Sequence, residues 1–235
     1  MVPRLGATGH DAREGRGRAE GERQREHEAA AEVEVDRDRR SAVAKPHRTD
    51  PRKADLRARL LATRRGLGAS ARARASHRIR AHLAGLAEVA RAEVVLGYAA
   101  TDAEVDLDPL LTDLLARGAT VALPVVEGSR LRLAAVTDLD ADLVAGHLGV
   151  REPRADCATI DPTAVAVALV PGVGFDREGG RLGYGGGHFD RLLAPMEATT
   201  LGVAFHAQLV QQIPRRPHDV AVDRVVTEEG VIHPS

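Results

Sequence analysis

The stretch Val165–Arg191 reads VAVALVPGVGFDREGGRLGYGGGHFDR. Its first residues form a short apolar run, rich in β-branched side chains, that ends at Pro171. Such a run, bounded by turn residues, is typical of a strand that is buried on both faces. Strands of that kind belong to parallel sheets covered by helices. The stretch therefore predicts a buried parallel strand with a glycine-rich segment directly behind it.

Eight glycines lie in the segment from Gly172 to Gly187. Glycine takes up positive φ freely and lets the backbone approach a ligand closely. A helical pattern follows at residues 192–196, and helix starts present free N–H groups to anions. Arg181 adds a planar cationic fork and Asp190 a hard oxygen, which favours a phosphate site with a metal. A plain surface loop is the open alternative, because the segment lacks both the P-loop ending and the dinucleotide-binding spacing.

The rest of the chain alternates apolar runs with helical patterns, which predicts an α/β protein. We expect strands at residues 94–98, 120–123, 131–136, 165–170, 201–205 and 225–227, and helices at residues 51–65, 70–90, 109–117 and 206–213. Ser70 is expected to cap the second helix, and the second strand to end before Pro124. The polar loop 99–107 would then lie at the carboxyl end of the first strand, where open α/β sheets bind ligands.

The bulk composition points to a small-molecule partner in a reducing compartment. The 235 residues are 43% hydrophobic but only 2% aromatic, so Leu, Val and Ala must fill the core. The formal net charge of −1 gives no indication of nucleic-acid or anionic-membrane binding. Cys157 is the single cysteine, which excludes an internal disulfide and a cysteine-built zinc site. Since no segment resembles a membrane span or a signal peptide, we expect a cytoplasmic monomer without nucleic-acid or membrane partners.

Residues 1–50 differ in composition from the remainder of the chain. They are rich in Arg, Glu, Ala and Gly and contain almost no large apolar residue. Such a composition cannot bury enough surface to offset the loss of chain entropy. We expect a disordered, charged N-terminal extension there and one folded domain over residues 51–235.

The first predicted helix carries a pair of cations. Asp50 can cap this helix, with Pro51 at its first position. Its apolar face consists of Leu56, Leu60 and Leu61. Lys53 and Arg57 lie four residues apart and share one face, and two like charges held together indicate an anion between them. The open alternative is a solvated basic face, which would also include Arg52, Arg59, Arg64 and Arg65.

The segment PGVGFDREGGRLGYGGGHFDR resembles the signature of the 5-formyltetrahydrofolate cyclo-ligase family, also called methenyltetrahydrofolate synthetases. The resemblance extends over roughly residues 51–230. It implies a Rossmann-like three-layer α/β/α fold with a mostly parallel sheet. It also implies ATP-dependent conversion of 5-formyltetrahydrofolate to 5,10-methenyltetrahydrofolate, with ATP and Mg²⁺ as cofactors.

The resemblance further implies roles for individual residues. Lys53 and Arg57, in the segment KADLR, would contact the ATP phosphates, and Glu104 would bind the folate. Asp219, in an H-D-x-x-V-D element, is similar to a magnesium-linked carboxylate of the family and would bind the metal together with Asp190. The predicted catalytic residue is Arg181. The predicted ATP site consists of Lys53, Arg57, Arg181, Leu182, Gly183, Tyr184, Gly185, Gly186, Gly187, His188 and Phe189, and the predicted folate site of Glu104, Ala99, Tyr184 and His188.

His188–Phe189 departs from the family pattern, in which two tyrosines usually follow the glycines. The phenolic hydroxyls of those tyrosines are absent here, and a histidine at this place can bring a pH dependence near neutrality. Tyr184 and Gly186 lie where some relatives carry Arg and Lys, so phosphate binding would depend more on the backbone and on Arg181. Two alternatives stay open: another phosphate-handling α/β enzyme, and a folate- or nucleotide-binding protein that has lost turnover.

Overall fold

The computed structural model of this chain describes residues 50–234, except for positions 102, 129 and 147–149. The predicted disorder of the N-terminal extension concerns residues that lie, apart from Asp50, outside this described part. Nowhere in the described ranges is there a helix long and apolar enough to cross a membrane.

The described residues form an eight-stranded central sheet with the spatial order β13-β12-β10-β7-β1-β2-β3-β6. Its strands are β1 (Val94–Leu96), β2 (Thr120–Glu127), β3 (Arg130–Val136), β6 (Thr159–Ile160), β7 (Val167–Pro171), β10 (Thr199–Val203), β12 (Arg224–Thr227) and β13 (Gly230–Ile232). The five strands from β12 to β2 in this order are parallel to one another. The strands β13, β3 and β6 are antiparallel to their neighbours. The predicted mostly parallel sheet is confirmed.

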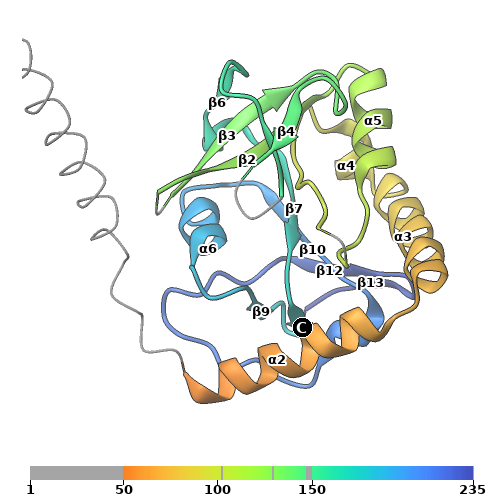
Figure 1. Cartoon of the computed structure of the whole chain (residues 1–235), viewed down its shortest axis with the longest axis vertical. Coiled ribbons are helices and arrows are strands. Elements are labelled where there is room, and N and C mark those ends of the chain that lie inside the picture. The colour runs from red at the N-terminus through yellow and green to blue at the C-terminus, as the bar shows by residue number, and fades with distance from the viewer. Residues whose placement is uncertain (1–49, 102, 129, 147–149, 235) are drawn as a thin grey trace, which may run out of the picture. The chain divides into compact units, whose positions relative to one another are not determined.

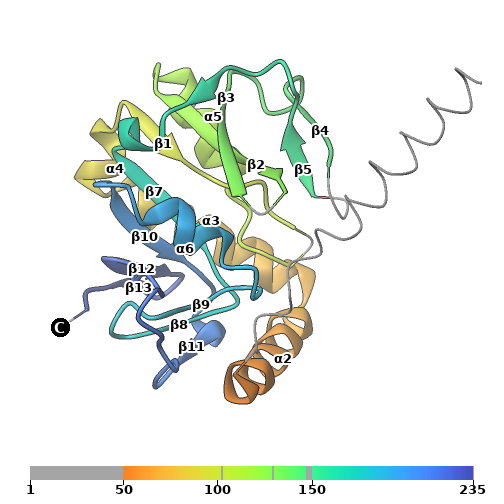
Figure 2. The same cartoon turned by 90° about the vertical axis from the view of Figure 1, so that its left-hand side faces the viewer.

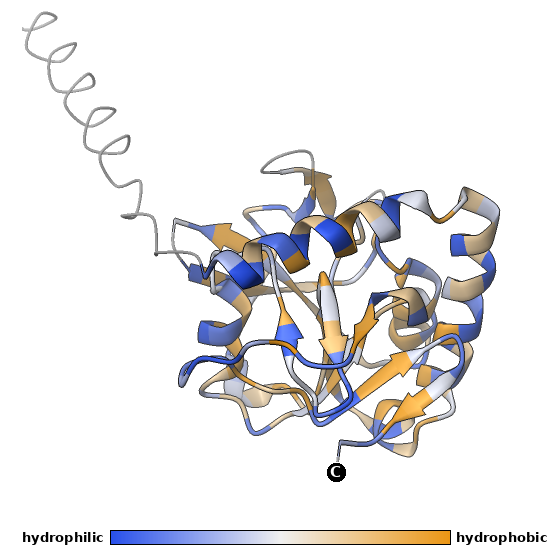
Figure 3. Ribbon diagram, turned by 90° about the horizontal axis from the view of Figure 1, so that it is seen from below, coloured by the Kyte–Doolittle hydropathy of each residue, from blue (hydrophilic) through white to orange (hydrophobic). Residues whose placement is uncertain are grey.

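The strand of the quoted stretch, β7, lies in the middle of this sheet between β1 and β10. Val167 and Leu169 belong to the hydrophobic cluster on one face, and Ala168 and Val170 to the cluster on the other. This alternation confirms a strand buried on both faces. In Figure 3 many strand residues are orange, whereas the helices contain many blue residues.

Helices cover both faces of the sheet, as the three-layer prediction requires (Figure 1). The helices are α2 (Pro51–Gly66), α3 (Ala69–Ala84), α4 (Ala87–Arg91), α5 (Asp108–Ala116) and α6 (His188–Leu193). Side chains of α3, α4 and α5 pack on one face, whereas Leu192 and Leu193 of α6 pack on the other. The second helical layer is therefore thin.

The single helix predicted over residues 70–90 is wrong. The chain forms α3 and α4 instead, with Gly85 as the C-cap of α3. Ser70 lies inside α3, whose N-cap is Gly68, without a side-chain capping bond. Glycine is a poor helix former and a common helix end, so the break follows from Gly85.

Helix α2 begins as predicted and packs beside a small second sheet (Figure 2). The Oδ1 atom of Asp50 accepts a hydrogen bond of 3.0 Å from the Arg52 N–H. The small sheet contains β11 (Leu209–Val210), β8 (Gly174–Asp176) and β9 (Arg181–Leu182), in that order. Leu60 of α2 is buried against it, and a Cβ atom at Gly174 would collide with Leu60. Gly174 thus permits the close packing of α2.

The small sheet corrects two predictions. The glycine segment is not one open loop, because residues 174–182 form the antiparallel pair β8–β9. The helix predicted over residues 206–213 is wrong, since only residues 206–208 form a helical turn, of the 3₁₀ type, and β11 follows. The buried Gln208 side chain donates hydrogen bonds of 3.0 Å to the carbonyls of Gly172 and Val173, which ties this turn to the glycine segment.

The sheet contains one strand that is longer than expected and a final strand that was not expected. Strand β2 continues through Pro124 to Glu127, paired with β3. The Thr120 N–H and the Ala122 carbonyl form hydrogen bonds on the side of β2 that faces β1. Every second residue of a strand has the same orientation, so the backbone nitrogen of Pro124 also faces this side, but β1 ends before reaching it. The missing N–H of Pro124 therefore breaks no ladder bond. A final strand, β13, forms a hairpin with β12 and was not predicted.

The strand order reverses between β1 and β7. From β1 the sheet continues to β2 on one side, and from β7 it continues to β10 on the other. The loop 97–107 leaves the carboxyl end of β1, and the glycine segment leaves the carboxyl end of β7. Ligands of open α/β sheets bind at such a reversal. The two segments that carry the predicted site therefore begin where the fold favours a site.

Asp176 is the residue whose loss should most weaken this arrangement. It is 1% exposed, its Oδ1 accepts bonds from the N–H groups of Glu178 and Gly180, and its Oδ2 accepts one from Ile213. In Asp176→Asn one of the two carboxylate oxygens becomes an NH₂ group, so the backbone N–H groups on that side lose their acceptor. We therefore expect the free energy of unfolding to fall by roughly 2–3 kcal/mol. Urea denaturation measures it.

The matched control is Asp138→Asn, because Asp138 also accepts two backbone N–H bonds but lies in an exposed turn. We expect a clearly smaller loss there, since both bonds end on Oδ1, which the amide oxygen of Asn can replace, and the rest of the side chain is in water. Equal losses in the two variants would contradict the structural role of Asp176.

Candidate functional site

Helix α2 directs a buried cation toward the loop that precedes β12. Lys53 is 9% exposed, and its ammonium group donates a hydrogen bond to Oδ2 of Asp219. The same oxygen accepts a bond of 2.7 Å from the Arg216 N–H. These bonds lower the pKa of Asp219 despite its partial burial, which acts in the opposite direction. Lys53 and Asp219, predicted for phosphate and metal, are thus in direct contact.

One helical turn further along, Arg57 contacts the glycine segment. Its Nε donates a bond of 2.8 Å to the Gly183 carbonyl. Gly185 has a φ of 108° and Gly187 a φ of 63°, so the backbone here takes conformations that only glycine adopts readily. Burial lowers the pKa of Arg57, but a guanidinium stays protonated at pH 7. Lys53 and Arg57 therefore contact two of the segments that carry predicted site residues, and phosphate binding by this pair stays a prediction.

A third cation of α2, Arg64, was missed by the sequence analysis. It is 4% exposed, and its Nη2 donates a bond of 2.6 Å to the Tyr184 hydroxyl. That hydroxyl donates a bond of 2.9 Å to Oε1 of Glu104. The alternative interpretation, a solvated basic face, is therefore wrong for Arg64. The available signal was spacing, because residues 53, 57, 60 and 64 follow the helical period along one face.

Glu104 is fixed by its own loop as well. Its Oε2 accepts a bond of 3.0 Å from the Thr101 N–H. The loop is held by Tyr98, whose buried hydroxyl donates a bond of 3.1 Å to the Val105 carbonyl. Burial, followed by the charge of Glu104, raises the pKa of the Tyr98 hydroxyl well above its usual value, so it remains a donor. Ala99, predicted for folate, is 8% exposed in the same loop.

Arg181 and Asp190 meet on the other side of the glycine segment. Nη2 of Arg181 donates a bond of 2.8 Å to Oδ1 of Asp190. The Arg181 guanidinium lies 5.7 Å from the centre of the Phe189 ring, within the range of a cation–π contact. Its Nε is buried without a hydrogen-bond partner among the described residues. An unpaired buried donor on a cation is a position that an anionic ligand would satisfy.

The two predicted metal ligands lie close together. The N–H of Val220, next to Asp219, donates a bond of 3.3 Å to Oδ1 of Asp190. The bonds given above engage Oδ1 of Asp190 and Oδ2 of Asp219, one oxygen of each carboxylate. Within the described residues no group of three or more His, Cys, Asp or Glu side chains could hold a metal ion. Two carboxylates that need further oxygens from a phosphate are the donor set that Mg²⁺ prefers, so the residues fit that ion.

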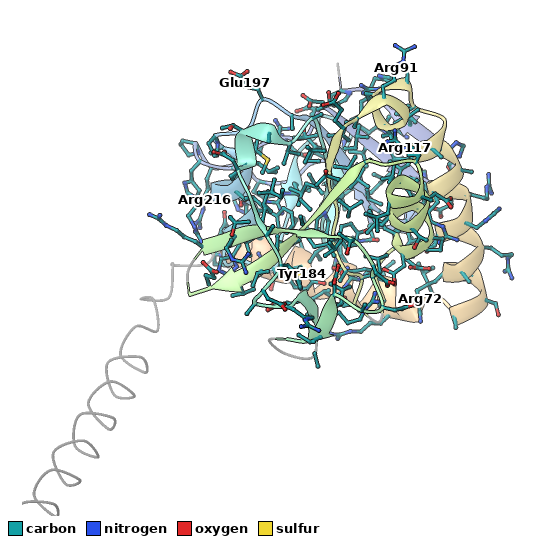
Figure 4. The ribbon with its side chains drawn as sticks, turned by 90° about the horizontal axis from the view of Figure 1, so that it is seen from above. Arg72, Arg91, Arg117, Tyr184, Glu197 and Arg216 are labelled. Atoms are coloured by element: carbon teal, nitrogen blue, oxygen red, sulfur yellow. The ribbon has the colours of Figure 1, made fainter. Side chains whose placement is uncertain are left out.

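Two members of the predicted ATP site differ from the rest. The side chain of Leu182 is 1% exposed and packs in the cluster that contains Leu60, so any ligand contact would come from its backbone. Tyr184, in contrast, is 56% exposed. Figure 4 shows it beside the faint ribbon of α2, away from Arg91 and Arg117. Tyr184 therefore lies at the surface of the protein.

His188 begins α6 directly behind the glycines. Partial burial lowers its pKa, and the neighbouring charge of Arg191 lowers it further. Both effects disfavour the imidazolium, so the neutral form of His188 predominates at pH 7. The expected pH dependence therefore moves toward the acidic side.

Comparisons with known proteins agree with these features. Residues 49–228 match the model of the 5-formyltetrahydrofolate cyclo-ligase family. The chain is 35% identical over 188 residues to the 5-formyltetrahydrofolate cyclo-ligase of Mycolicibacterium smegmatis, covering 77% of this chain and 96% of that protein. Its identity to the Escherichia coli cyclo-ligase is 33% over 151 residues, covering 61% and 82%.

Two solved structures are also similar. The 5,10-methenyltetrahydrofolate synthetase of Aquifex aeolicus superposes with a TM-score of 0.69 at 37% identity, covering 77% of this chain and 92% of that chain. The synthetase of Mycoplasma pneumoniae has a TM-score of 0.62 at 21% identity, covering 75% and 98%. The second likeness supports the fold alone.

The environment of His188 gives a direct prediction. We expect its pKa, followed by NMR of the imidazole resonances, to lie below 6.5, because burial and the Arg191 charge both disfavour the cation. In Arg191→Gln one of these causes is removed, so the pKa should rise while staying below 6.5. A pKa above 6.5 in the parent protein would contradict the placement of His188.

Proposed function

Because this chain belongs to the 5-formyltetrahydrofolate cyclo-ligase family, we propose that it catalyses the ATP-dependent cyclisation of 5-formyltetrahydrofolate to 5,10-methenyltetrahydrofolate. ADP and phosphate are the other products. The observation that carries this proposal is the meeting of α2, the β1 loop, the glycine segment and the loop before β12 at the strand-order reversal. Lys53 with Asp219, Arg57 with Gly183 and Tyr184 with Glu104 connect these four parts.

The chemical problem is a poor leaving group. The formyl oxygen on N5 is an amide oxygen, so direct attack of N10 on the formyl carbon stalls. We propose that the γ-phosphoryl group of ATP is transferred to this oxygen. N10 then attacks the activated carbon and closes the five-membered ring, and the C–O bond breaks as phosphate leaves. This route needs positioning and charge neutralisation but no protein nucleophile.

In this proposal the cations of the site neutralise the phosphates. Arg181 is the catalytic residue, because its guanidinium is paired with Asp190 next to the glycines and its Nε has no partner among the described residues. Lys53 and Arg57 bind the other phosphates from the α2 side, and the backbone of residues 182–187 surrounds them. His188 and Phe189 complete the ATP site. Since His188 is neutral at pH 7, the positive charge comes from Lys53 and the arginines.

Asp190 and Asp219 are the proposed magnesium ligands. Mg²⁺ would neutralise charge on the phosphate oxygens and hold them in line with the acceptor. Lys53 pairs with Asp219 and Arg181 with Asp190, while the bond from the Val220 N–H to Asp190 keeps the two positions close together. These ion pairs orient the two aspartates for a ligand that also binds phosphate.

The folate site is proposed on the β1 side. The carboxylate of Glu104 is an acceptor for the N–H groups of the pterin ring, with Ala99 lining the same loop. Tyr184 and His188 would contact the substrate from the glycine segment. We also propose a cytoplasmic location, which the single cysteine supports because it fits a reducing compartment, and we propose that the protein is a monomer.

The decisive test measures ADP release and the absorbance of the methenyl product with purified protein, MgATP and 5-formyltetrahydrofolate. We expect turnover in the parent protein and a loss of about 10²–10³-fold in kcat for Arg181→Ala, the cost of removing a donor that stabilises transition-state charge. The matched control, Arg177→Ala, changes an exposed arginine four residues earlier and should retain the parent rate.

Three outcomes separate the candidate functions. Product formation that disappears in Arg181→Ala supports the cyclo-ligase. Nucleotide binding without ADP release would favour a binding protein that lost turnover with the His188–Phe189 change. Phosphate transfer that does not respond to 5-formyltetrahydrofolate would indicate another phosphate-handling enzyme.

The magnesium proposal has its own test. In Asp190→Asn we expect the Mg²⁺ concentration for half-maximal rate, at fixed ATP, to rise about tenfold or more, because a neutral amide is a weaker ligand than a carboxylate. Asp156→Asn, in an exposed loop, is the control and should leave this concentration unchanged. An unchanged requirement in Asp190→Asn would exclude Asp190 as a ligand.

A further inference from the structure

Arg64, Tyr184 and Glu104 form one buried polar cluster that draws on three separate parts of the chain. The side chains of Arg64 and Glu104 are 5% and 8% exposed. Tyr184 adds its hydroxyl to the pair while its ring stays at the surface. The cluster thus lies between the protein interior and the open side of the site.

The hydroxyl of Tyr184 is the link within this cluster. The direct approach of Arg64 Nη1 to Glu104 Oε1 is long, at 3.5 Å. The path through the hydroxyl is short, with 2.6 Å from Arg64 Nη2 and 2.9 Å to Oε1. The Arg64 guanidinium also lies 5.8 Å from the centre of the Tyr184 ring. Arg64 therefore reaches Glu104 mainly through Tyr184.

Both oxygens of Glu104 have defined partners. Oε2 accepts the Thr101 N–H, and Oε1 accepts the Tyr184 hydroxyl. A carboxylate held at both oxygens has one orientation, and a buried carboxylate needs a counter-charge to remain ionised. Among the described residues, Arg64 is the cation that lies within 4 Å of this carboxylate.

We propose that Arg64 is a positioning residue for folate binding, which fixes the Glu104 carboxylate through the Tyr184 hydroxyl so that it accepts the N–H groups of the pterin ring. This assignment rests on the proposed function of the site. Arg64 itself does not touch the substrate. It acts as the counter-charge behind Glu104 and as the donor that orients Tyr184.

A purely structural role for Arg64 makes a different prediction. If Arg64 only ties α2 to the loops, its removal should weaken folate and nucleotide binding alike, since α2 also carries Lys53 and Arg57. If it positions Glu104, folate binding weakens and nucleotide binding does not. The two ligands therefore separate the two roles.

The experiment measures equilibrium binding of 5-formyltetrahydrofolate and of MgADP by calorimetry, with thermal unfolding recorded for each variant. In Arg64→Met we expect the folate Kd to rise at least about tenfold, the equivalent of one hydrogen bond to a charged group, with an unchanged Kd for MgADP. Arg64→Lys keeps the charge but not the planar fork and should recover part of the loss. Arg65→Met, the exposed neighbour on α2, should match the parent protein.

The link through the hydroxyl is tested by a double-mutant cycle. Because Arg64 acts through Tyr184, Arg64→Met and Tyr184→Phe should not be additive, and the double variant should bind folate little worse than Arg64→Met alone. Additive losses would overturn the proposed path. If Arg64→Met fails to fold, the ligand selectivity of Arg64→Lys decides in its place.

The outcomes also separate this proposal from the proposed function. A parent protein that binds no 5-formyltetrahydrofolate overturns both. A parent protein that binds and converts it, while Arg64→Met binds it equally well or loses both ligands to the same extent, overturns the role of Arg64 alone.

Discussion

The site depends on one constraint: the buried cations of α2 must find acceptors. Lys53 and Arg64 are each less than 10% exposed, and a charge removed from water is stable only with a partner. Their partners, Asp219 and the pair Glu104–Tyr184, belong to loops that are far apart in the sequence. Satisfying these charges therefore places three loops around one helix. The apolar contacts of Leu60 keep that helix in place beneath them.

The sheet determines where this gathering occurs. Parallel strands deliver their carboxyl ends to one edge, and the reversal of strand order between β1 and β7 leaves two neighbouring loops that turn in opposite directions. The loop behind β1 carries Glu104, and the glycine segment behind β7 carries Arg181 on β9. Asp176 then folds the start of the glycine segment into β8–β9, so that the glycines from Gly183 onward lie at a defined position beside α2. Rigid hydrogen bonding in the first half of the segment supports the glycine-rich second half.

Patterns in the sequence predicted the parts of this arrangement that depend on neighbouring residues. The alternating elements and the start of α2 follow from apolar spacing and from Asp50, and the resemblance added the expected roles of Arg57 and Glu104. Local patterns missed what tertiary contacts decide. In the sequence Arg64 cannot be distinguished from a solvated arginine, because its partner Glu104 lies far away along the chain. The segment behind β10 looks helical, but pairing of β11 with β8 and the bonds of Gln208 hold it extended.

The departure at His188–Phe189 is partly offset within the same segment. Phe189 keeps an aromatic ring near the Arg181 guanidinium, so this position differs from a tyrosine in its hydroxyl and not in its ring. A phenolic hydroxyl is nevertheless present at Tyr184, where it bridges Arg64 and Glu104. Burial, with the charge of Glu104, raises the pKa of this hydroxyl, so it remains a neutral donor at pH 7. Tyr184 thus supplies a phenolic hydroxyl to the carboxylate of Glu104, the proposed folate ligand, from a position before the usual tyrosine pair. The cation that pairs with this carboxylate is Arg64 of α2.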